Sequence, residues 1–322
     1  MSYKVIFCGT PPISVEILKG LENIDVEIVG IITQPDKKVG RKKEIMPSPV
    51  KQYSLEKKYP IIQPYKMIDS FEQIKALNAD FLITCAFGQF VPQKILNLFK
   101  NSINVHASLL PKYRGGSPIQ FAIKDGCQKT GISLMKMIKK MDAGAVYAQE
   151  ELKIETNDDS GSLFDKMAVL GKNMIEKYLI DILNETLTGI VQDENEVTFA
   201  YNLTNEQEEI DWKLPKHDIV NFIRALSPAP IAFTHINDER IKIKKARVIG
   251  DEEIFIAVSK IFQVGEIVTT DKEGIIVQTI DGYIKILELQ RSGKTMVDAG
   301  SFHFPNSPLH MGIRFGQKIE QN

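Results

Sequence analysis

Short apolar runs alternate with amphipathic segments through the first half of the chain. The runs are rich in β-branched residues and bounded by turn signals, which is typical of buried strands. They cover residues 4–9, 26–34, 79–88 and 102–108. After the first run, apolar side chains recur at helical spacing from Ile13 to Leu21. Strands separated by helices predict parallel βαβ units, in which ligands bind at the carboxyl ends of the strands.

This alternation continues to about residue 185. Ser117 followed by Pro118 predicts the start of a short helix. Residues 131–154 are expected to form two strands joined by a turn at 141–144. The long helix that follows has apolar side chains on one face, which indicates core packing rather than a cofactor site. These side chains are Leu163, Met167, Leu170, Met174, Tyr178 and Ile182.

The composition changes after residue 185. A polar stretch rich in Asn, Glu and Thr is interpreted as a linker, and a helix is predicted at 215–226. Short alternating runs with regularly spaced turns then indicate a small barrel. The runs cover residues 232–236, 240–250, 264–270, 274–280 and 282–290.

We therefore predict an α/β fold with two domains. Residues 1–189 are expected to form a Rossmann-like, mostly parallel sheet with helices on both faces. Residues 190–205 form the linker, and residues 206–322 form a small OB-like β-barrel domain. The tail after about residue 295 receives no role.

Composition argues against several classes of protein. The 322-residue chain has a formal net charge of −1, so a polyanionic partner would have to meet local basic patches. Three cysteines lie far apart and five histidines are scattered, which argues against a disulfide framework and a metal site. Neither GTPP at 9–12 nor the glycine pair at 115–116 matches a nucleotide-binding motif. Without a signal-peptide layout or a long apolar stretch, a cytoplasmic protein with no membrane partner is expected.

Candidate chemistry gathers at a predicted strand end. Asn104 and His106 alternate on one face of the strand. An Asn amide can donate to an oxyanion, a His can accept a proton near neutral pH, and Asp142 in a sharp turn could orient the imidazole. Because Ser108 has no GxSxG elbow around it, the set suits direct acyl transfer without a covalent intermediate. The same spacing also fits a histidine with a purely structural role.

Basic residues cluster between the first two predicted βα units. The cluster consists of Lys37, Lys38, Arg41, Lys42 and Lys43. A charge run of this kind can be a solvated face, but near the predicted site it could contact an RNA backbone. A second basic pattern places Arg240, Lys242 and Lys244 on one face of a predicted strand, as on any edge strand protected by charge.

The run NVHASLLPKYRGGSPIQ at 104–120, together with MDAG at 141–144, resembles the formyltransferases that use 10-formyltetrahydrofolate. The resemblance implies that Asn104, His106 and Asp142 form the catalytic trio. It implies a folate site with no metal. The folate residues would be Ser108, Leu109, Leu110 and Pro111 of the SLLP turn, and Phe87, Gly88, Phe90 and Val91 bordering the pterin.

Other segments resemble the members of this family that act on methionyl-tRNA. They are residues 7–18, 33–51, 210–212 and the predicted barrel. The resemblance implies formyl transfer to the α-amino group of initiator methionyl-tRNA for translation initiation. It also implies that the basic segment and the second domain contact the tRNA. No obligatory protein partner is indicated.

Three alternatives stay open on the residues alone. A formyltransferase acting on a sugar-nucleotide amine would share the trio, although it needs no extended basic segment. A glycinamide ribonucleotide formyltransferase would leave the second domain without a task. A non-catalytic RNA-binding module would explain the basic segment and leave the trio unused.

Overall fold

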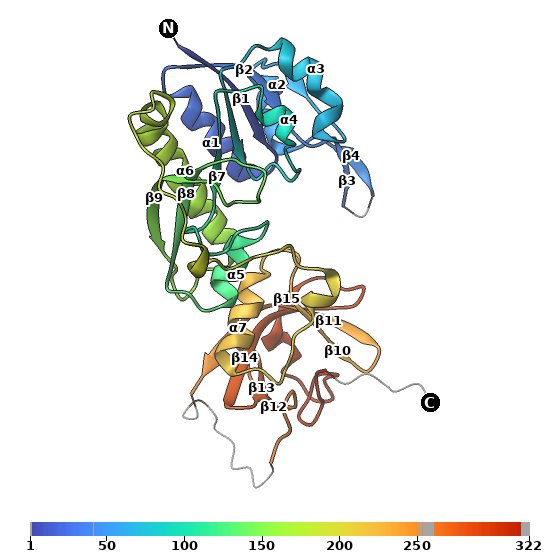
Figure 1. The fold of residues 1–322 in the computed structure, drawn as a ribbon. Coiled ribbons are helices and arrows are strands. Elements are labelled where there is room, and N and C mark those ends of the chain that lie inside the picture. The colour runs from blue at the N-terminus through green and yellow to red at the C-terminus, as the bar shows by residue number, and fades with distance from the viewer. Residues whose placement is uncertain (1, 41, 251–252, 254–260, 317–322) are drawn as a thin grey trace. The chain divides into compact units, whose positions relative to one another are not determined.

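The computed structural model describes residues 2–40, 42–250, 253 and 261–316 (Figure 1). The chain divides into two compact units. Unit 1 comprises Met1–Pro118, Lys129–Lys153 and Phe164–Asn202. Unit 2 comprises Ile119–Gln128, Ile154–Leu163 and Leu203–Asn322. Two short segments from the first half of the chain therefore belong to the second unit.

Unit 1 is built on a seven-stranded sheet in the order β5-β2-β1-β6-β7-β8-β9. The first five strands in that order pair in parallel, and β8 and β9 continue the sheet in antiparallel pairing. The strands are β1 (Tyr3–Gly9), β2 (Val26–Ile32), β5 (Ile61–Ile62), β6 (Phe81–Cys85), β7 (Asn101–His106), β8 (Lys129–Lys136) and β9 (Val146–Lys153). The predicted Rossmann-like, mostly parallel sheet is confirmed.

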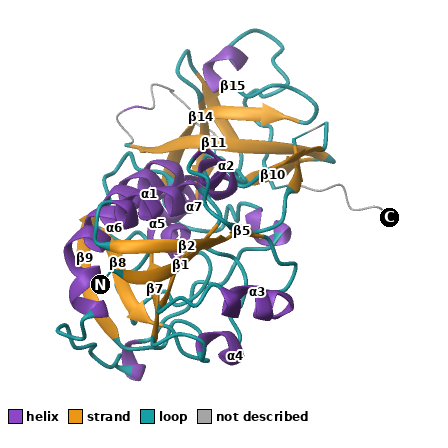
Figure 2. Ribbon diagram, turned by 90° about the horizontal axis from the view of Figure 1, so that it is seen from above, coloured by secondary structure: helices purple, strands orange, loops and turns teal. Residues whose placement is uncertain are grey.

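Helices cover both faces of this sheet. Figure 2 shows α1 and α6 along one face and α3 and α4 along the other. The helices are α1 (Pro12–Glu22), α2 (Pro49–Glu56), α3 (Phe71–Ala76), α4 (Gln93–Leu96) and α6 (Ser160–Leu183), with the 3-10 helices η1 (Met67–Ser70) and η2 (Glu194–Glu196). Gly171 lets α6 approach α1, since a Cβ there would lie 2.6 Å from Ile17 Cδ1. The predicted core face of α6 is confirmed at Met167 and Met174, which are fully buried.

The basic segment, in which no strand is predicted, forms a hairpin. Strand β3 (Lys37–Val39) pairs antiparallel with β4 (Glu44–Met46), and Lys43 N donates to Gly40 O at the turn. Gly40 there has a φ of +71°, which suits glycine. Figure 1 shows the hairpin standing away from the sheet of unit 1. Because the pairing uses backbone hydrogen bonds and leaves Ile45 and Met46 exposed, the alternation of side chains does not reveal it.

Unit 2 contains an antiparallel sheet in the order β10-β11-β14-β13-β12, with β15 paired to β14. Its strands are β10 (Phe233–Ile236), β11 (Glu239–Ile249), β12 (Ile267–Thr270), β13 (Ile275–Thr279), β14 (Gly282–Arg291) and β15 (Val297–Asp298). Its helices are α5 (Pro118–Lys124), α7 (Lys216–Ala225), η3 (Asn205–Glu208) and η5 (Ala299–Phe302). Helix α7 buries Ile219, Phe222 and Ile223 against this sheet.

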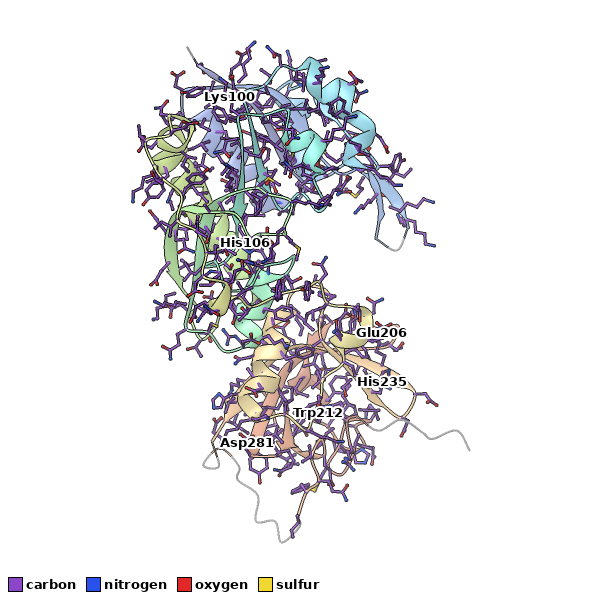
Figure 3. All side chains as sticks on the ribbon, in the orientation of Figure 1. Lys100, His106, Glu206, Trp212, His235 and Asp281 are labelled. Carbon is purple, nitrogen blue, oxygen red and sulfur yellow. The ribbon has the colours of Figure 1, made fainter. Side chains whose placement is uncertain are left out.

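The tail of the chain closes this sheet into a small barrel. Ile267 N at β12 donates to Ile313 O, and Gly316 N donates to His235 O on β10. Through these bonds, residues 313–316 link β12 and β10, the two outer strands of the sheet. Phe315 then stacks on Trp212, which is labelled in Figure 3. The ring centroids lie 5.3 Å apart, within the core of unit 2.

Candidate active site

Two of the predicted catalytic residues, Asn104 and His106, lie at the end of β7, and Figure 3 labels His106. Asn104 and His106 share one face of β7, because they are two residues apart on a strand. Parallel pairing aligns Asn104 with Thr84 of β6, and antiparallel pairing aligns His106 with Ser133 of β8. The order of the strands reverses between β1 and β6. In such folds, ligands bind at the carboxyl ends of the strands beside this point.

Asn104 presents its amide in one orientation. Thr84 Oγ1 donates a hydrogen bond of 2.7 Å to Asn104 Oδ1, so the amide oxygen faces Thr84. The NH₂ group then points away from Thr84, and no partner for it occurs among the residues that the structure describes. A half-buried, neutral donor without a partner is suited to stabilise an oxyanion.

His106 is buried between two acceptors. Its Nε2 lies 3.0 Å from Tyr113 O, and its Nδ1 lies 3.8 Å from Asp142 Oδ2. A carbonyl oxygen only accepts, so Nε2 carries the hydrogen and Nδ1 of the neutral ring is the nitrogen able to accept a proton. An imidazolium would place an N–H toward both neighbours, with Asp142 as its counter-charge.

The backbone around these groups adopts unusual conformations. Asp142 and Tyr113 have φ values of 48° and 60°, in the left-handed region. In this left-handed conformation, the carbonyl oxygen of Tyr113 lies against the imidazole of His106. Gly115 N donates to Asp142 Oδ2 at 2.9 Å, and a Cβ at Gly115 would lie 2.5 Å from Ala200 O. The glycine is needed for close packing and for this hydrogen bond, since no side chain fits there.

Gln192 bonds to the Asp142 turn and Arg114 bonds to Gln192, and the sequence predicted neither residue as part of the site. Arg114 is fully buried and donates through Nε and Nη2 to Gln192 Oε1, at 3.0 and 2.8 Å. Gln192 Nε2 donates in turn to the carbonyl oxygens of Asp142 and Gly144, at 2.8 and 2.7 Å. Arg114 lies inside the motif at 104–120, so its position in the sequence could have indicated that it belongs to the site. Gln192 lies in a polar, aperiodic stretch, which offered none.

An exposed carboxylate completes this group. Glu194 pairs with Lys140 at 2.6 Å and with Arg114 at 3.0 Å. Hydrogen bonds from Lys140 and Arg114 hold the pKa of Glu194 below its ordinary value. The carboxylate is therefore charged at neutral pH and balances the buried guanidinium.

The SLLP turn is fixed by side chains from β8 and β9. Ser133 Oγ donates to Ser108 O at 2.6 Å and accepts from Leu110 N at 3.1 Å. Gln149 Nε2 donates to Leu110 O at 2.8 Å. Ser108 and Leu110 are buried, whereas Leu109 and Pro111 are half-buried. The turn is thus rigid, with its partly open surface at Leu109 and Pro111.

The other predicted folate segment follows β6, the neighbour of β7 in the sheet. Phe87 and Val91 are buried in the core of unit 1. Phe87 O accepts from Thr10 Oγ1 at 2.9 Å, which ties the segment to the end of β1. Gly88, with a φ of 81°, and Phe90 are exposed. Within this segment, Gly88 and Phe90 are accessible to a ligand, and Phe87 and Val91 hold the backbone.

The predicted tRNA-binding cations of unit 1 lie on the β3–β4 hairpin. Lys37, Lys38, Lys42 and Lys43 are exposed, and Arg41 lies outside the described residues. At the base of the hairpin, Asp36 accepts hydrogen bonds from Gln63 and Lys51, at 2.9 and 2.7 Å. Hydrogen bonds from Gln63 and then Lys51 hold the pKa of Asp36 below its ordinary value.

The basic face of β11 in unit 2 is engaged internally. Lys244 pairs with Glu288 at 2.6 Å, and Lys242 donates to Pro230 O at 3.1 Å. The guanidinium of Arg240 lies 3.6 Å from the centroid of the Phe233 ring. These contacts argue against a free basic surface. The interpretation of this strand as a charged edge is also wrong, because β11 pairs with β10 on one side and with β14 on the other.

The described residues contain no group of three or more His, Cys, Asp and Glu side chains that could hold a metal ion. Among the same residues, no helix combines the length and the apolar character needed to cross a membrane.

Comparison with known proteins identifies close relatives. Residues 3–179 match the family described as formyl transferase, and residues 202–304 match the formyl transferase C-terminal domain. The methionyl-tRNA formyltransferase of Mycoplasma capricolum is 50% identical over 302 residues, covering 93% of this chain and 94% of the relative. That of Bacillus cereus is 41% identical over 318 residues, covering 98% and 99%.

Solved structures with the same fold are more distant in sequence. WlaRD, a sugar 3N-formyl transferase, matches with a TM-score of 0.63 and 21% identity, covering 92% of this chain and 100% of that one. HypX from Aquifex aeolicus in complex with tetrahydrofolic acid matches with a TM-score of 0.62 and 13% identity, covering 94% of this chain and 47% of that longer one. These two likenesses concern the fold alone. From the family matches and the relatives at 40–50% identity, the chain belongs to the formyl transferase family, among the methionyl-tRNA formyltransferases.

Proposed function

We propose that this protein transfers the formyl group of 10-formyltetrahydrofolate to the α-amino group of initiator methionyl-tRNA, for translation initiation in the cytoplasm. The observation that carries the proposal is the geometry at the end of β7. An amide donor, a buried imidazole and a carboxylate converge there in a chain whose relatives carry that name. Each of the three groups has a task in acyl transfer to an amine.

The reaction starts with attack of the neutral amine on the formyl carbon. An α-amino group titrates near ~7.7–8.0, so removing its proton is within the reach of imidazole. Asn104 Nδ2 donates to the oxyanion of the tetrahedral intermediate. His106 Nδ1 takes the proton of the attacking nitrogen, and Asp142 stabilises the resulting imidazolium at 3.8 Å. The bond between the carbon and N10 of the folate then breaks, and the proton passes to N10.

The folate co-substrate is proposed to bind across the ends of β6 and β7. The SLLP turn would support it through Leu109 and Pro111, with Ser108 and Leu110 keeping the turn in place. Gly88 and Phe90 would contact the pterin from the neighbouring segment, backed by Phe87 and Val91. The rigidity of the turn supports this proposal, because a preformed site loses little entropy on binding.

The charged tRNA is proposed to contact the β3–β4 hairpin through its basic residues, including Arg41. We also propose that residues 1–189 form the catalytic domain, that 190–205 is the linker, and that the barrel at 206–322 assists tRNA binding. Because Lys244 and Arg240 are engaged internally, other residues of unit 2 would make that contact.

A direct assay distinguishes this proposal from the alternative in which the substrate is a sugar-nucleotide amine. Formyl transfer from 10-formyltetrahydrofolate should be fast with initiator methionyl-tRNA and negligible with a dTDP-linked amino sugar. His106→Ala should lower kcat by about 10²–10⁴, since it removes the proton acceptor. Preference for the sugar amine would contradict the proposed substrate. Full activity of His106→Ala would return His106 to a structural role.

A further inference from the structure

We propose that Gln192, held by Arg114, is a positioning residue for Asp142 in the formyl transfer proposed above. It contacts no reacting atom. It acts on the backbone of the turn that carries the carboxylate, from a segment 50 residues further along the chain. The inference rests on the proposed function and assigns a role to part of the polar stretch that follows α6.

The Asp142 turn is held from two sides. On one side Gly115 N donates to the carboxylate Oδ2 at 2.9 Å. On the other side Gln192 Nε2 donates to the backbone carbonyls of Asp142 and Gly144. The two contacts together set where Oδ2 lies relative to His106 Nδ1. Because a misplacement of about 1 Å at a catalytic group can cost about 10²-fold in rate, this double restraint bears on catalysis.

The amide of Gln192 suits this position because it both accepts and donates. Its Oε1 accepts two hydrogen bonds from the Arg114 guanidinium, and these bonds fix which end of the amide is the oxygen. Its NH₂ group is thereby directed at the two carbonyls of the turn. A carboxylate at this position could still bind Arg114, but it would oppose the carbonyl oxygens of Asp142 and Gly144 with negative charge.

The side chains of Arg114 and Gln192 are buried, which favours a role in the site over a contact on the protein surface. Arg114 is fully buried and Gln192 is 8% exposed. Within the described part of the chain, Arg114 Nη1 is buried without a hydrogen-bond partner. A buried donor left unpaired is unfavourable and calls for an explanation. Nε and Nη2 of the same guanidinium hold the Gln192 amide against the Asp142 turn.

The first experiment compares Gln192→Met with Gln93→Met. Both changes remove a side-chain amide, but Gln93 is exposed on α4, where its Nε2 donates to Asn97 Oδ1. Gln192→Met should lower kcat by about 10–100-fold and change the KM values for both substrates by less than about threefold. Gln93→Met should leave kcat unchanged. Normal kcat in folded Gln192→Met would overturn the proposal.

A double-mutant cycle tests whether the effect passes through Asp142. In an Asp142→Asn background, Gln192→Met should cost little further, because the carboxylate that it positions is already gone. Full additivity of the two changes would overturn the proposal in favour of a general structural role. If Gln192→Met folds poorly, Gln192→Glu keeps the volume and the contact with Arg114, and should show the same fall in kcat.

A substrate-independent readout separates this inference from the proposed function. The ring nitrogens of His106, observed by NMR in the free protein, should shift in Gln192→Met and stay unchanged in Gln93→Met. Unchanged His106 signals in Gln192→Met would overturn the inference whatever the protein formylates. Failure of the wild-type protein to formylate methionyl-tRNA would instead overturn the proposed function and leave this NMR comparison valid.

Discussion

At the scale of single residues, hydrogen bonds orient the side chains of the candidate active site. Thr84 donates to Asn104 Oδ1, so the NH₂ group of Asn104 is directed away from Thr84. Tyr113 O occupies one nitrogen of His106 and leaves the other facing Asp142. Both arrangements place a donor and a proton acceptor before any substrate binds, which is the preorganisation that acyl transfer needs.

The role of Asn104 can be tested together with that of its partner. Asn104→Ala should lower kcat by about 10²–10³ with little change in folate affinity, because the lost donor acts on transition-state charge. Thr84→Val keeps the shape of Thr84 but frees the amide to rotate, so its loss in kcat should be smaller and in the same direction. Steady-state kinetics would measure both. A normal kcat in Asn104→Ala would remove the amide from the mechanism.

At the scale of elements, the end of β7 and the turn between β8 and β9 carry the candidate catalytic residues, and the hairpin after β2 carries exposed cations. The hairpin is tied to unit 1 at its base, where Asp36 bonds to Gln63 and Lys51. Its basic side chains lie beyond that anchor, and the described ones are exposed. This arrangement suits contact with a phosphate backbone better than packing within the protein.

Salt dependence tests this role of the hairpin. Changing Lys37, Lys38, Arg41, Lys42 and Lys43 to Ala should raise KM for methionyl-tRNA and leave KM for the folate nearly unchanged. Each lost phosphate contact should flatten the dependence of log K on log salt by about 0.9, if the acceptor stem behaves like duplex DNA. Binding of tRNA titrated with salt measures the slope.

A matched control removes exposed cations from elsewhere on unit 1. Lys58, Lys66 and Lys75 changed to Ala lower the positive charge without touching the hairpin. This variant should keep the slope of the wild-type protein. Equal slopes for the hairpin variant and the control would mean that the hairpin is a solvated surface.

At the scale of the whole molecule, each unit has a core of its own. The core of unit 2 includes Trp212, the only tryptophan of the chain, which donates to Thr234 and stacks on Phe315. The tail that carries Phe315 also links β12 to β10. The last described residues therefore stabilise the barrel from both its edge and its interior.

Truncation of this aromatic contact should destabilise unit 2 selectively. Phe315→Ala removes a ring that is 1% exposed and should lower the free energy of unfolding of unit 2 by about 3–5 kcal/mol. Phe304→Ala removes a ring of the same tail that is 51% exposed and should change it by less than about 0.5 kcal/mol. Trp212 fluorescence during urea unfolding measures both. Identical unfolding curves for the two variants would contradict the role of Phe315 in the core.

Local signals in the sequence were enough to predict the fold class and the centre of the site. Strand periodicity and β-branched runs identified β1, β2, β6 and β7, because burial on both faces demands apolar side chains at successive positions. The alternation of Asn104 with His106 put both on one face of a strand, since the side-chain repeat of a strand is two residues. The turn at Asp142 was also visible, because glycine and aspartate favour sharp turns.

Contacts between distant segments belong to the tertiary structure alone. Gln192 meets the Asp142 turn across 50 residues, and the tail meets β10 through the backbone of Gly316. A single amide in a polar stretch carries no periodic signal, and a backbone hydrogen bond depends little on which side chains flank it. For the same reason, the sequence did not predict the pairing of β3 with β4 or the backbone contacts that close the barrel. Periodicity reports which side chains are buried, whereas these features depend on which backbones are brought side by side.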